Sequence, residues 1–239
     1  MIIRGITLSG TSVQDMPGIV TASLYANYDA TTGISGSTFS DSSGNGHTAT
    51  LFNSATTTTF NSLQVLRLSS AASQYFLDTV GYGTDLDNAF TFDVWAYPLT
   101  GSSPGVLIAE WDNPNINIGG FNDNQMGFAD GTIQMGLYNT GTVTGPGWTL
   151  LNWYNIVMTY DGSIMRTYVN NAAGGTTSGA KSNPGDTYLT MGAPANDYLG
   201  INNTPYFNGY IGAWKIYNRA LSVAEVSQNF AALRGRYGL

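Results

Sequence analysis

Residues 153–169 read WYNIVMTYDGSIMRTYV, and this stretch decides the fold. Two runs rich in β-branched and aromatic residues, Trp153–Tyr160 and Ile164–Val169, flank the dipeptide Asp161-Gly162. Such runs favour strands, and Asp-Gly between them favours a tight reversal of the chain. The stretch therefore predicts an antiparallel hairpin.

Short apolar runs separated by turn residues recur outward from this hairpin in both directions. Thr, Tyr and Phe are frequent in the runs, whereas Gly, Asn and Asp fill the intervals, as in chains made of many short strands. No repeat of fixed period is present, which argues against a propeller or a solenoid. We therefore expect an all-β fold, a two-sheet antiparallel sandwich. Its further strands are expected at 90–97, 106–111, 132–138, 188–191 and 210–217.

One segment near the carboxyl end has the pattern of a helix instead. Ser222 and Glu225 form a capping box, in which the serine oxygen accepts a backbone N–H while the glutamate reaches back. Gly235 is placed to end the helix. The pattern predicts one short C-terminal helix at about 222–234, packed on the edge of the sandwich. Its apolar stripe comprises Val226, Phe230 and Leu233.

The composition narrows the range of partners. Only 10% of the 239 residues are charged, and the formal net charge is −7. A surface of this sign repels phosphate backbones, so we expect no nucleic-acid partner. No stretch approaches the roughly 20 apolar residues of a membrane helix, and no signal-peptide pattern opens the chain. We therefore expect no membrane insertion and synthesis in the cytoplasm. The chain has no cysteine, which excludes disulfides and cysteine-zinc sites.

Residues 1–19 stand apart from residues 20–239, which we expect to form one domain. The run Ile2–Leu8 alternates like a strand, and Pro17-Gly18 then interrupts the pattern. Two interpretations are open. The segment is either the first strand of the sandwich or an assembly arm that pairs with a neighbouring subunit.

Four segments, in this order along the chain, resemble motifs of the laminin-G-like domains of the concanavalin A-like lectins. The resemblance implies a jelly roll of two packed antiparallel sheets, carbohydrate or protein binding at the loop rims, and frequently a calcium ion. It does not imply one ligand, because one fold serves many functions. The segments are DSSGNGHTATL at 41–51, FTFDVW at 90–95, WYNIVMTYDG with YVNN within 153–171, and FNGYI with YNRALSVAE within 207–225.

The end of the chain, residues 229–239, resembles the endings of such domains on bacteriophage structural proteins. This resemblance implies a non-catalytic structural or adhesion module on a virion surface, a capsid-decoration or fibre-type subunit that binds glycans weakly. Its partners would be other virion or surface proteins and glycans, and it would form a homo-oligomer. The alternative is a free-standing carbohydrate-binding lectin or an extracellular cell-surface module.

A structural calcium ion is the cofactor that the resemblance implies, and its expected ligands lie in or near the glycine-rich turn. They are Asp41 and Asn45, joined by Asp29. Their oxygens suit a hard cation that takes six to eight oxygen ligands. The alternative is that Asp41 hydrogen-bonds backbone N–H groups of its own turn. Gly212 and Ala213 stand where the family often has acidic residues, which counts against calcium.

Sugar binding is expected where aromatic and polar side chains gather in loops, because sugars present both apolar faces and hydroxyls. The predicted ligand-binding residues are Trp111, Asp112 and Asn113 in one loop, Asp197, Tyr198 and Tyr206 in a second, and the isolated Trp148. The alternative is that polar loops of this kind belong to any sandwich and that Trp148 covers the core. Trp95, Trp153 and Trp214 lie inside strand patterns and are predicted to be core residues.

Catalysis is not expected, and no catalytic residue is assigned. The only histidine, His47, falls in the glycine-rich turn and is predicted to be a turn residue. Glycosidases need paired carboxylates. Glu110 begins the E-x-D-x-E pattern of concanavalin-like glucanases, but Pro114 stands where the third acid belongs. The only other glutamate, Glu225, is assigned to the helix cap, so a glycoside hydrolase is the least favoured interpretation.

Overall fold

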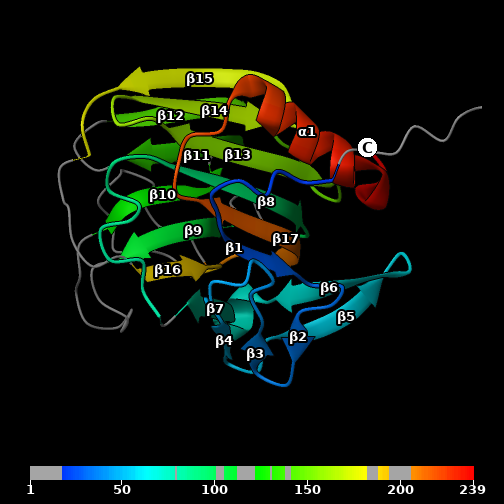
Figure 1. Ribbon diagram of the computed structural model, residues 1–239. Coiled ribbons are helices and arrows are strands. Elements are labelled where there is room, and N and C mark those ends of the chain that lie inside the picture. Colours follow the sequence, from blue (N-terminus) through cyan, green and yellow to red (C-terminus); the bar gives the residue numbers. More distant parts are fainter. Residues whose placement is uncertain are drawn as a thin grey trace, which may run out of the picture.

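The computed structural model shows two antiparallel β-sheets packed face to face, with one α-helix in the described part of the chain (Figure 1). The predicted all-β sandwich with a short C-terminal helix is therefore confirmed. The described residues are 18–78, 80–100, 105–111, 122–129, 131–137, 141–181, 188–193 and 206–239.

The back sheet is the one against which the C-terminal helix packs. Its strands lie in the order β15-β14-β13-β8-β17-β6-β5, and β1 also pairs with β17. The strands are β1 (Leu24–Asp29), β5 (Thr56–Phe60), β6 (Leu63–Leu68), β8 (Phe90–Pro98), β13 (Tyr154–Tyr160), β14 (Ile164–Val169), β15 (Ala172–Ser178) and β17 (Gly209–Tyr217).

The front sheet faces the back sheet across the core. Its order is β12-β11-β10-β9-β16-β7-β4-β3-β2. The strands are β2 (Ile34–Ser35), β3 (Thr38–Phe39), β4 (Ala49–Phe52), β7 (Tyr75–Asp78), β9 (Gly105–Trp111), β10 (Asn122–Ala129), β11 (Thr132–Leu137), β12 (Gly141–Gly147) and β16 (Tyr188–Met191).

The hairpin predicted from residues 153–169 is confirmed as β13 and β14, with Tyr160 opposite Met165. Gly162 in its turn has a φ of +95°, a left-handed conformation that glycine adopts without steric cost. The Oδ1 atom of Asp161 accepts hydrogen bonds from the backbone N–H groups two and three residues on. The Asp-Gly pair therefore forms the turn through both its backbone and its side chain.

The three tryptophans predicted to be core residues are buried. Trp214 lies between the sheets, where its ring is 5.3 Å from Tyr28 and 5.2 Å from Phe76, measured between ring centroids. Trp95 and Trp153 lie instead on the outer face of the back sheet, in a separate cluster beneath the C-terminal segment. Burial of apolar area on both faces of the back sheet stabilises the fold.

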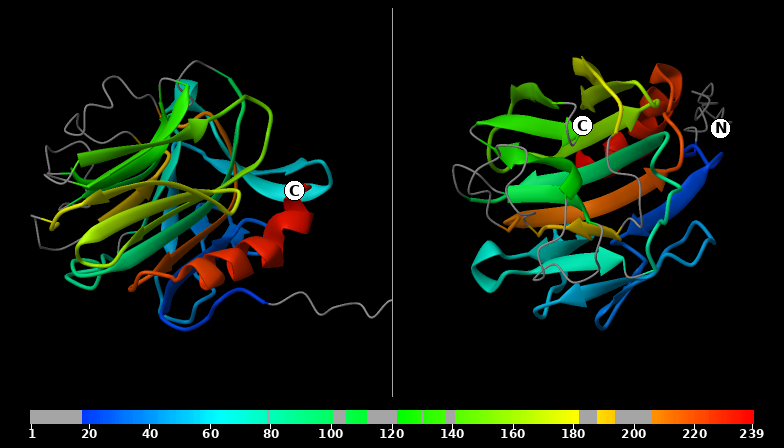
Figure 2. Two further views of the ribbon diagram at one scale, coloured as in Figure 1. Left: turned by 90° about the horizontal axis from the view of Figure 1, so that it is seen from above. Right: turned by 90° about the vertical axis from the view of Figure 1, so that its left-hand side faces the viewer.

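The C-terminal helix, α1 (Val223–Leu233), begins at the predicted capping box. Ser222 Oγ accepts a hydrogen bond from the backbone N–H of Glu225, and the Glu225 carboxylate accepts one from the Ser222 backbone. The predicted apolar stripe is buried, and Asn229 is buried beside it. Figure 2 shows α1 lying along the outer side of the back sheet.

The predicted bounds of the helix, about 222–234, are confirmed to within one residue at each end, but Gly235 is not the residue that stops the helical turns. A 3-10 helix, η2 (Arg234–Tyr237), continues through it and is followed by a glycine with a φ of +75°. The added turn carries Tyr237 onto the aromatic face, where its ring stacks on Trp95 at 4.4 Å. Gly212 leaves room for it, because a Cβ there would lie 2.3 Å from the Tyr237 hydroxyl. Glycine at position 212 therefore has a steric role.

The described chain begins beside this helix. Gln228 Nε2 donates to the Gly18 carbonyl at 2.8 Å, and Val20 N donates to Asn229 Oδ1 at 2.8 Å. The segment predicted to be a first strand or an assembly arm comprises residues 1–19. Residues 1–17 lie outside the described residues, so both interpretations stay predictions. The helices in the described part are too short or too polar to cross a membrane.

Candidate functional site

The outer face of the front sheet carries a row of aromatic side chains, here called the front row: Phe52, Tyr75, Tyr206 and Tyr188. The rings of Phe52 and Tyr75 stack in parallel, 4.6 Å apart and at 1°. The ring of Tyr206 lies 6.1 Å from that of Tyr75. Tyr188 packs against the same small cluster, which is separate from the main core. Tyr75 is buried, and the other three are half-buried.

Strand alternation places these rings outside. In β4, Leu51 belongs to the main core, and the next residue, Phe52, belongs to the outer cluster. In β7 the order is reversed, since Tyr75 lies outside and Phe76 inside. Successive side chains of a strand point to opposite faces, and Phe52 and Tyr75 are paired across β4 and β7. Their parallel stack follows from this register.

A polar fringe borders one end of the front row. Gln74 Nε2 donates to the carbonyls of Asn53 and Ser54, both at 3.1 Å. Asn53 Nδ2 donates to the Ser73 carbonyl at 2.6 Å. Burial raises the pKa of Tyr75, and the neighbouring Tyr206 raises it further. Tyr75 therefore stays uncharged at neutral pH.

The predicted sugar-binding residues are partly gathered at this face. Tyr206 is in the front row, and its backbone bridges to Val106 of β9. The backbone of Trp111, at the end of β9, pairs with Tyr188. The other members of the two predicted loops, Asp112, Asn113, Asp197 and Tyr198, lie outside the described residues. Sequence reasoning missed Phe52, Tyr75 and Tyr188, because alternation in short strands does not show which of the two sets of side chains faces outward.

Trp148 lies elsewhere. It is half-buried and packs against the main core, with its ring edge-on to Phe128 at 5.5 Å. Its backbone N–H donates to the Gly131 carbonyl at 3.3 Å. The position fits the alternative that Trp148 covers the core, and it does not bring this ring into the front row.

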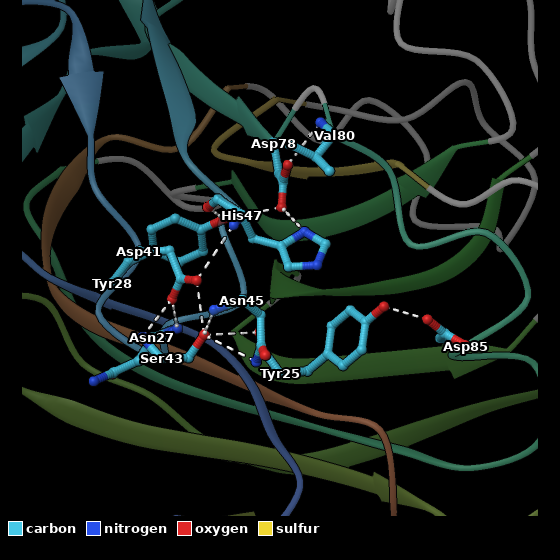
Figure 3. A network of polar contacts seen from close by, with 10 residues as sticks. All are labelled: Tyr25, Asn27, Tyr28, Asp41, Ser43, Asn45, His47, Asp78, Val80 and Asp85. Atoms are coloured by element: carbon cyan, nitrogen blue, oxygen red, sulfur yellow. Dashed lines mark hydrogen bonds and ion pairs between the residues drawn. The ribbon is translucent and has the colours of Figure 1, made fainter.

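A second polar site surrounds Asp41 in the glycine-rich turn (Figure 3). Asp41 Oδ1 accepts the backbone N–H groups of Asn27 and Ser43, both at 2.8 Å. Asp41 Oδ2 accepts the Ser43 hydroxyl at 2.7 Å and the His47 backbone N–H at 3.3 Å. Both oxygens of this carboxylate are thus used to hold the turn.

The other two predicted calcium ligands have different partners. Asn45 Nδ2 donates to the Leu24 and Tyr25 carbonyls, at 3.0 and 2.9 Å. Asp29 accepts hydrogen bonds from Thr31 and forms an ion pair with Arg236 at 2.5 Å. The described residues contain no group of three or more His, Asp or Glu that could hold a metal ion. Asp29, Asp41 and Asn45 each have protein partners in the structure, and the calcium site stays a prediction.

His47 is more than a turn residue. Its side chain is buried, and Nδ1 lies 2.9 Å from Oδ2 of the fully buried Asp78. Its ring stacks on Tyr82 at 4.4 Å and 9°. Asp78 also accepts the Tyr28 hydroxyl at 3.0 Å. The pair therefore ties the glycine-rich turn to β7, and Figure 3 shows the imidazole and this carboxylate pointing toward each other.

At the rim of this network, Tyr25 donates its hydroxyl to Asp85. Burial raises the pKa of Tyr25 to about 12, and the hydrogen bond to Asp85 adds to the shift. The phenol therefore stays protonated and remains a donor at neutral pH. The tyrosine connects the turn at 41–47 to the loop that follows β7 (Figure 3).

Glu110, the start of the glucanase-like pattern, is fully buried and forms an ion pair with Lys181 at 2.5 Å. The same ammonium group lies 3.3 Å from Asp87. The residue before it, Ala109, packs in an outer cluster with Tyr188. Because successive strand residues face opposite sides, the Glu110 carboxylate points away from the front row. It does not flank a ligand on that face.

The laminin G model of the concanavalin A-like lectin/glucanases superfamily matches residues 70–227, and the chain belongs to this superfamily. No curated protein sequence matches the chain.

Solved structures share the fold at low sequence identity. One is domain 4 of AbnA, a GH43 extracellular arabinanase from Geobacillus stearothermophilus, in complex with arabinotriose. Its TM-score is 0.61 at 16% identity, over 87% of this chain and 98% of that domain. Another is the Trypanosoma rangeli sialidase in complex with sialic acid, with a TM-score of 0.64 at 16% identity, over 90% of this chain. The chain spans only 34% of that sialidase. At these identities, both matches show the fold alone.

Proposed function

We propose that the chain is a non-catalytic carbohydrate-binding module whose front row holds an uncharged, extended oligosaccharide. The observation that carries this proposal is the row itself, with aromatic rings on three strands of one sheet face and a fringe of amides at its end. Flat rings cover the apolar faces of sugars, and amides and phenols bond their hydroxyls. The net charge of −7 disfavours an anionic ligand. The similar arabinanase domain has a structure in complex with arabinotriose, which makes neutral oligosaccharides the first ligands to test.

Absence of catalysis is part of the proposal. Hydrolysis of a glycosidic bond uses two carboxyl groups that flank the bond. Of the two glutamates, Glu110 is buried against Lys181, and Glu225 caps α1 and accepts from Arg219. The buried pair of His47 and Asp78 is packed against the rings of Tyr25 and Tyr82. These contacts give Glu110, Glu225 and Asp78 structural partners, which supports a non-catalytic role.

The proposed location of the module is a virion surface. We propose it, together with a homo-oligomeric state and partners among virion or cell-surface proteins, on the resemblance of residues 229–239 to endings of phage structural proteins. Extracellular display as a free-standing lectin is the alternative. Light scattering of the purified chain separates these settings, since a defined oligomer supports the first and a monomer supports the second.

The function is tested by calorimetric titration of the full chain with arabinotriose, xylotriose and cellotriose. We expect at least one to bind, and Phe52→Ala and Tyr206→Ala to weaken that binding by about tenfold or more, the effect of losing one good stacking contact. Val223→Ala, at an exposed apolar residue of α1, is the matched control and should leave affinity unchanged. Unchanged affinity in both front-row variants, or turnover of any of the sugars, would overturn the proposal.

A further inference from the structure

A second aromatic surface lies on the opposite face of the molecule, where the β5–β6 hairpin stands beside the carboxyl end of the chain. A hollow of about 250 Å³ opens between them. In the left view of Figure 2, the cyan hairpin projects past the carboxyl end of the helix. The hollow is lined by Phe60, Asn61 and Leu63 of the hairpin, by Trp153, and by residues 235–238.

Three of the lining residues, Phe60, Trp153 and Tyr237, are aromatic, and they alternate with polar groups. The Trp153 ring lies 4.5 Å from Tyr237 and 5.4 Å from Tyr97. Tyr97 lies 4.8 Å from Phe60, whose ring also stacks on Tyr210 at 4.7 Å. The edge of this surface is exposed, because Phe60, Tyr97 and Tyr210 are only half-buried. A molecule entering the hollow meets aromatic residues on the hairpin side, Phe60, and on the sheet side, Trp153.

The hairpin wall is held in place. Asn61 and Ser62 have φ values of 48° and 65°, the left-handed pair that builds the tightest hairpin turn. Arg67 then ties β6 to the start of β17. Its NH2 group donates to Asn208 Oδ1 at 2.7 Å, and its guanidinium lies 5.8 Å from the Tyr210 ring centroid. A wall fixed in this way loses little conformational freedom when a ligand binds.

The opposite wall is also fixed. Arg234 Nε donates to the Leu239 carbonyl at 2.8 Å, and the Leu239 backbone N–H donates to the Arg234 carbonyl at 3.0 Å. Arg236 lines the hollow, but its guanidinium is paired with the Asp29 carboxylate at 2.5 Å. Its charge is therefore largely compensated. The exposed Asn61 contributes a neutral amide at the rim.

The volume, the charge and the lining residues of the hollow together restrict the class of ligand that it can bind. The volume is below the roughly 300–1,000 Å³ of sites that enclose a whole small molecule, which suits one ring of a longer chain. The compensated arginine and the net charge of −7 favour an uncharged ligand. Ring faces with a neutral amide at the rim match the apolar face and the hydroxyls of a sugar.

We propose that this hollow is a second sugar subsite, which takes one ring of an uncharged oligosaccharide between Phe60 and Trp153. The inference rests on the proposed function and extends it, since the module would hold sugar chains on two opposite faces. Two sites on one rigid domain raise the effective affinity for a surface that carries many glycan chains.

The test is calorimetric titration of the full chain with arabinotriose, xylotriose and cellotriose, comparing Phe60→Leu with Phe52→Leu. Each leucine keeps an apolar contact and removes one ring, and thermal melting verifies that each variant folds. We expect two equivalents of the bound sugar per wild-type chain, one in either single variant, and a loss of binding of at least about tenfold at both sites in the double variant.

Three other outcomes are distinct. Binding of one equivalent that Phe52→Leu abolishes and Phe60→Leu leaves intact overturns the second subsite and keeps the proposed function. One equivalent lost only in Phe60→Leu supports the hollow and overturns the front row. A lower melting temperature of Phe60→Leu with unchanged stoichiometry assigns the hollow to protein packing and also overturns the second subsite. No binding of any of the three sugars overturns both proposals.

Discussion

The two sheets carry aromatic side chains on their outer faces, but within the described part of the chain a helix covers only the back sheet. On the back sheet, α1 and η2 lie over Trp95 and Trp153, and Trp95 is 0% exposed. On the front sheet, Phe52, Tyr188 and Tyr206 remain half-buried. The same residue types are therefore buried where the C-terminal segment covers them and half-buried where it does not, and our proposals assign ligand contact to the half-buried rings. The two faces differ because residues 222–239 cover the aromatic residues of the back sheet only.

The first prediction sets a buried ring against an exposed one. Trp95→Ala removes a ring stacked on Tyr237 at 4.4 Å and should lower the free energy of unfolding by about 3–5 kcal/mol. Phe52→Ala, in the half-buried front row, should cost about 1 kcal/mol. Urea denaturation of both variants measures the difference. Equal losses would mean that the front row is part of the stabilising core and would remove the distinction between the faces.

A second prediction concerns the end of the sandwich where His47 ties the glycine-rich turn to the front sheet. His47→Ala leaves the fully buried Asp78 carboxylate without its imidazole partner. We expect a loss of about 2–4 kcal/mol in the free energy of unfolding, because a buried polar group without its partner is costly. Asn45→Ala, in the same turn but exposed, is the control and should cost about 1 kcal/mol or less. A small effect of His47→Ala would show that the turn is held by Asp41 alone.

The third prediction concerns a variant that destabilises α1, the helix that covers the back sheet. Ser222→Ala removes the capping oxygen of α1 and should cost about 1 kcal/mol. Because α1 packs on the back sheet, sugar binding at the front row should not change. Denaturation and calorimetric titration of one sample measure both effects. Loss of front-row binding in this variant would show that the two faces are coupled, against the comparison drawn above.

The smallest effect is expected from pH. Hydrogen bonds from Arg219 lower the pKa of Glu225 to about 2, below its ordinary 4.5. A carboxyl group with a lowered folded-state pKa stabilises the protein above its unfolded pKa, and this stability is lost as the pH falls toward 2. Both partners are partly exposed, so we expect less than about 1 kcal/mol. Between pH 5 and pH 2 the stability of wild type should fall more than that of Glu225→Gln. Parallel pH profiles would contradict this role.

The site was harder to predict than the fold, for a local reason. The hairpin at Asp161-Gly162 and the cap at Ser222 involve residues within a few positions of each other, so their chemistry is readable along the chain. Phe52 and Tyr75 meet through the pairing of β4 with β7. Whether such a residue points to the core or to solvent changes with a shift of one position in register. Short strands with aromatics on both faces do not reveal which alternate set is exposed.

Longer-range contacts explain the two other differences between prediction and structure. His47 reads as a turn residue because its neighbours are turn-formers, and its partner Asp78 is 31 positions away. The α-helix ends near Gly235 as predicted, because glycine often follows helices, but a 3-10 turn continues to Gly238 and buries Tyr237 against Trp95. In both cases a contact with a distant residue outweighs a local preference.

By itself, the sequence determined the class of fold, the deciding hairpin, the helix cap and the burial of the three strand tryptophans, because these follow from periodicity and from contacts between near neighbours. Only the tertiary structure decided which aromatic rings are covered by α1 and η2, and which are left on the front row and around the hollow. Which rings are covered depends on how segments distant in the sequence pack together. The exposed and the buried aromatic residues occur in strands of similar sequence pattern, so the pattern does not distinguish them.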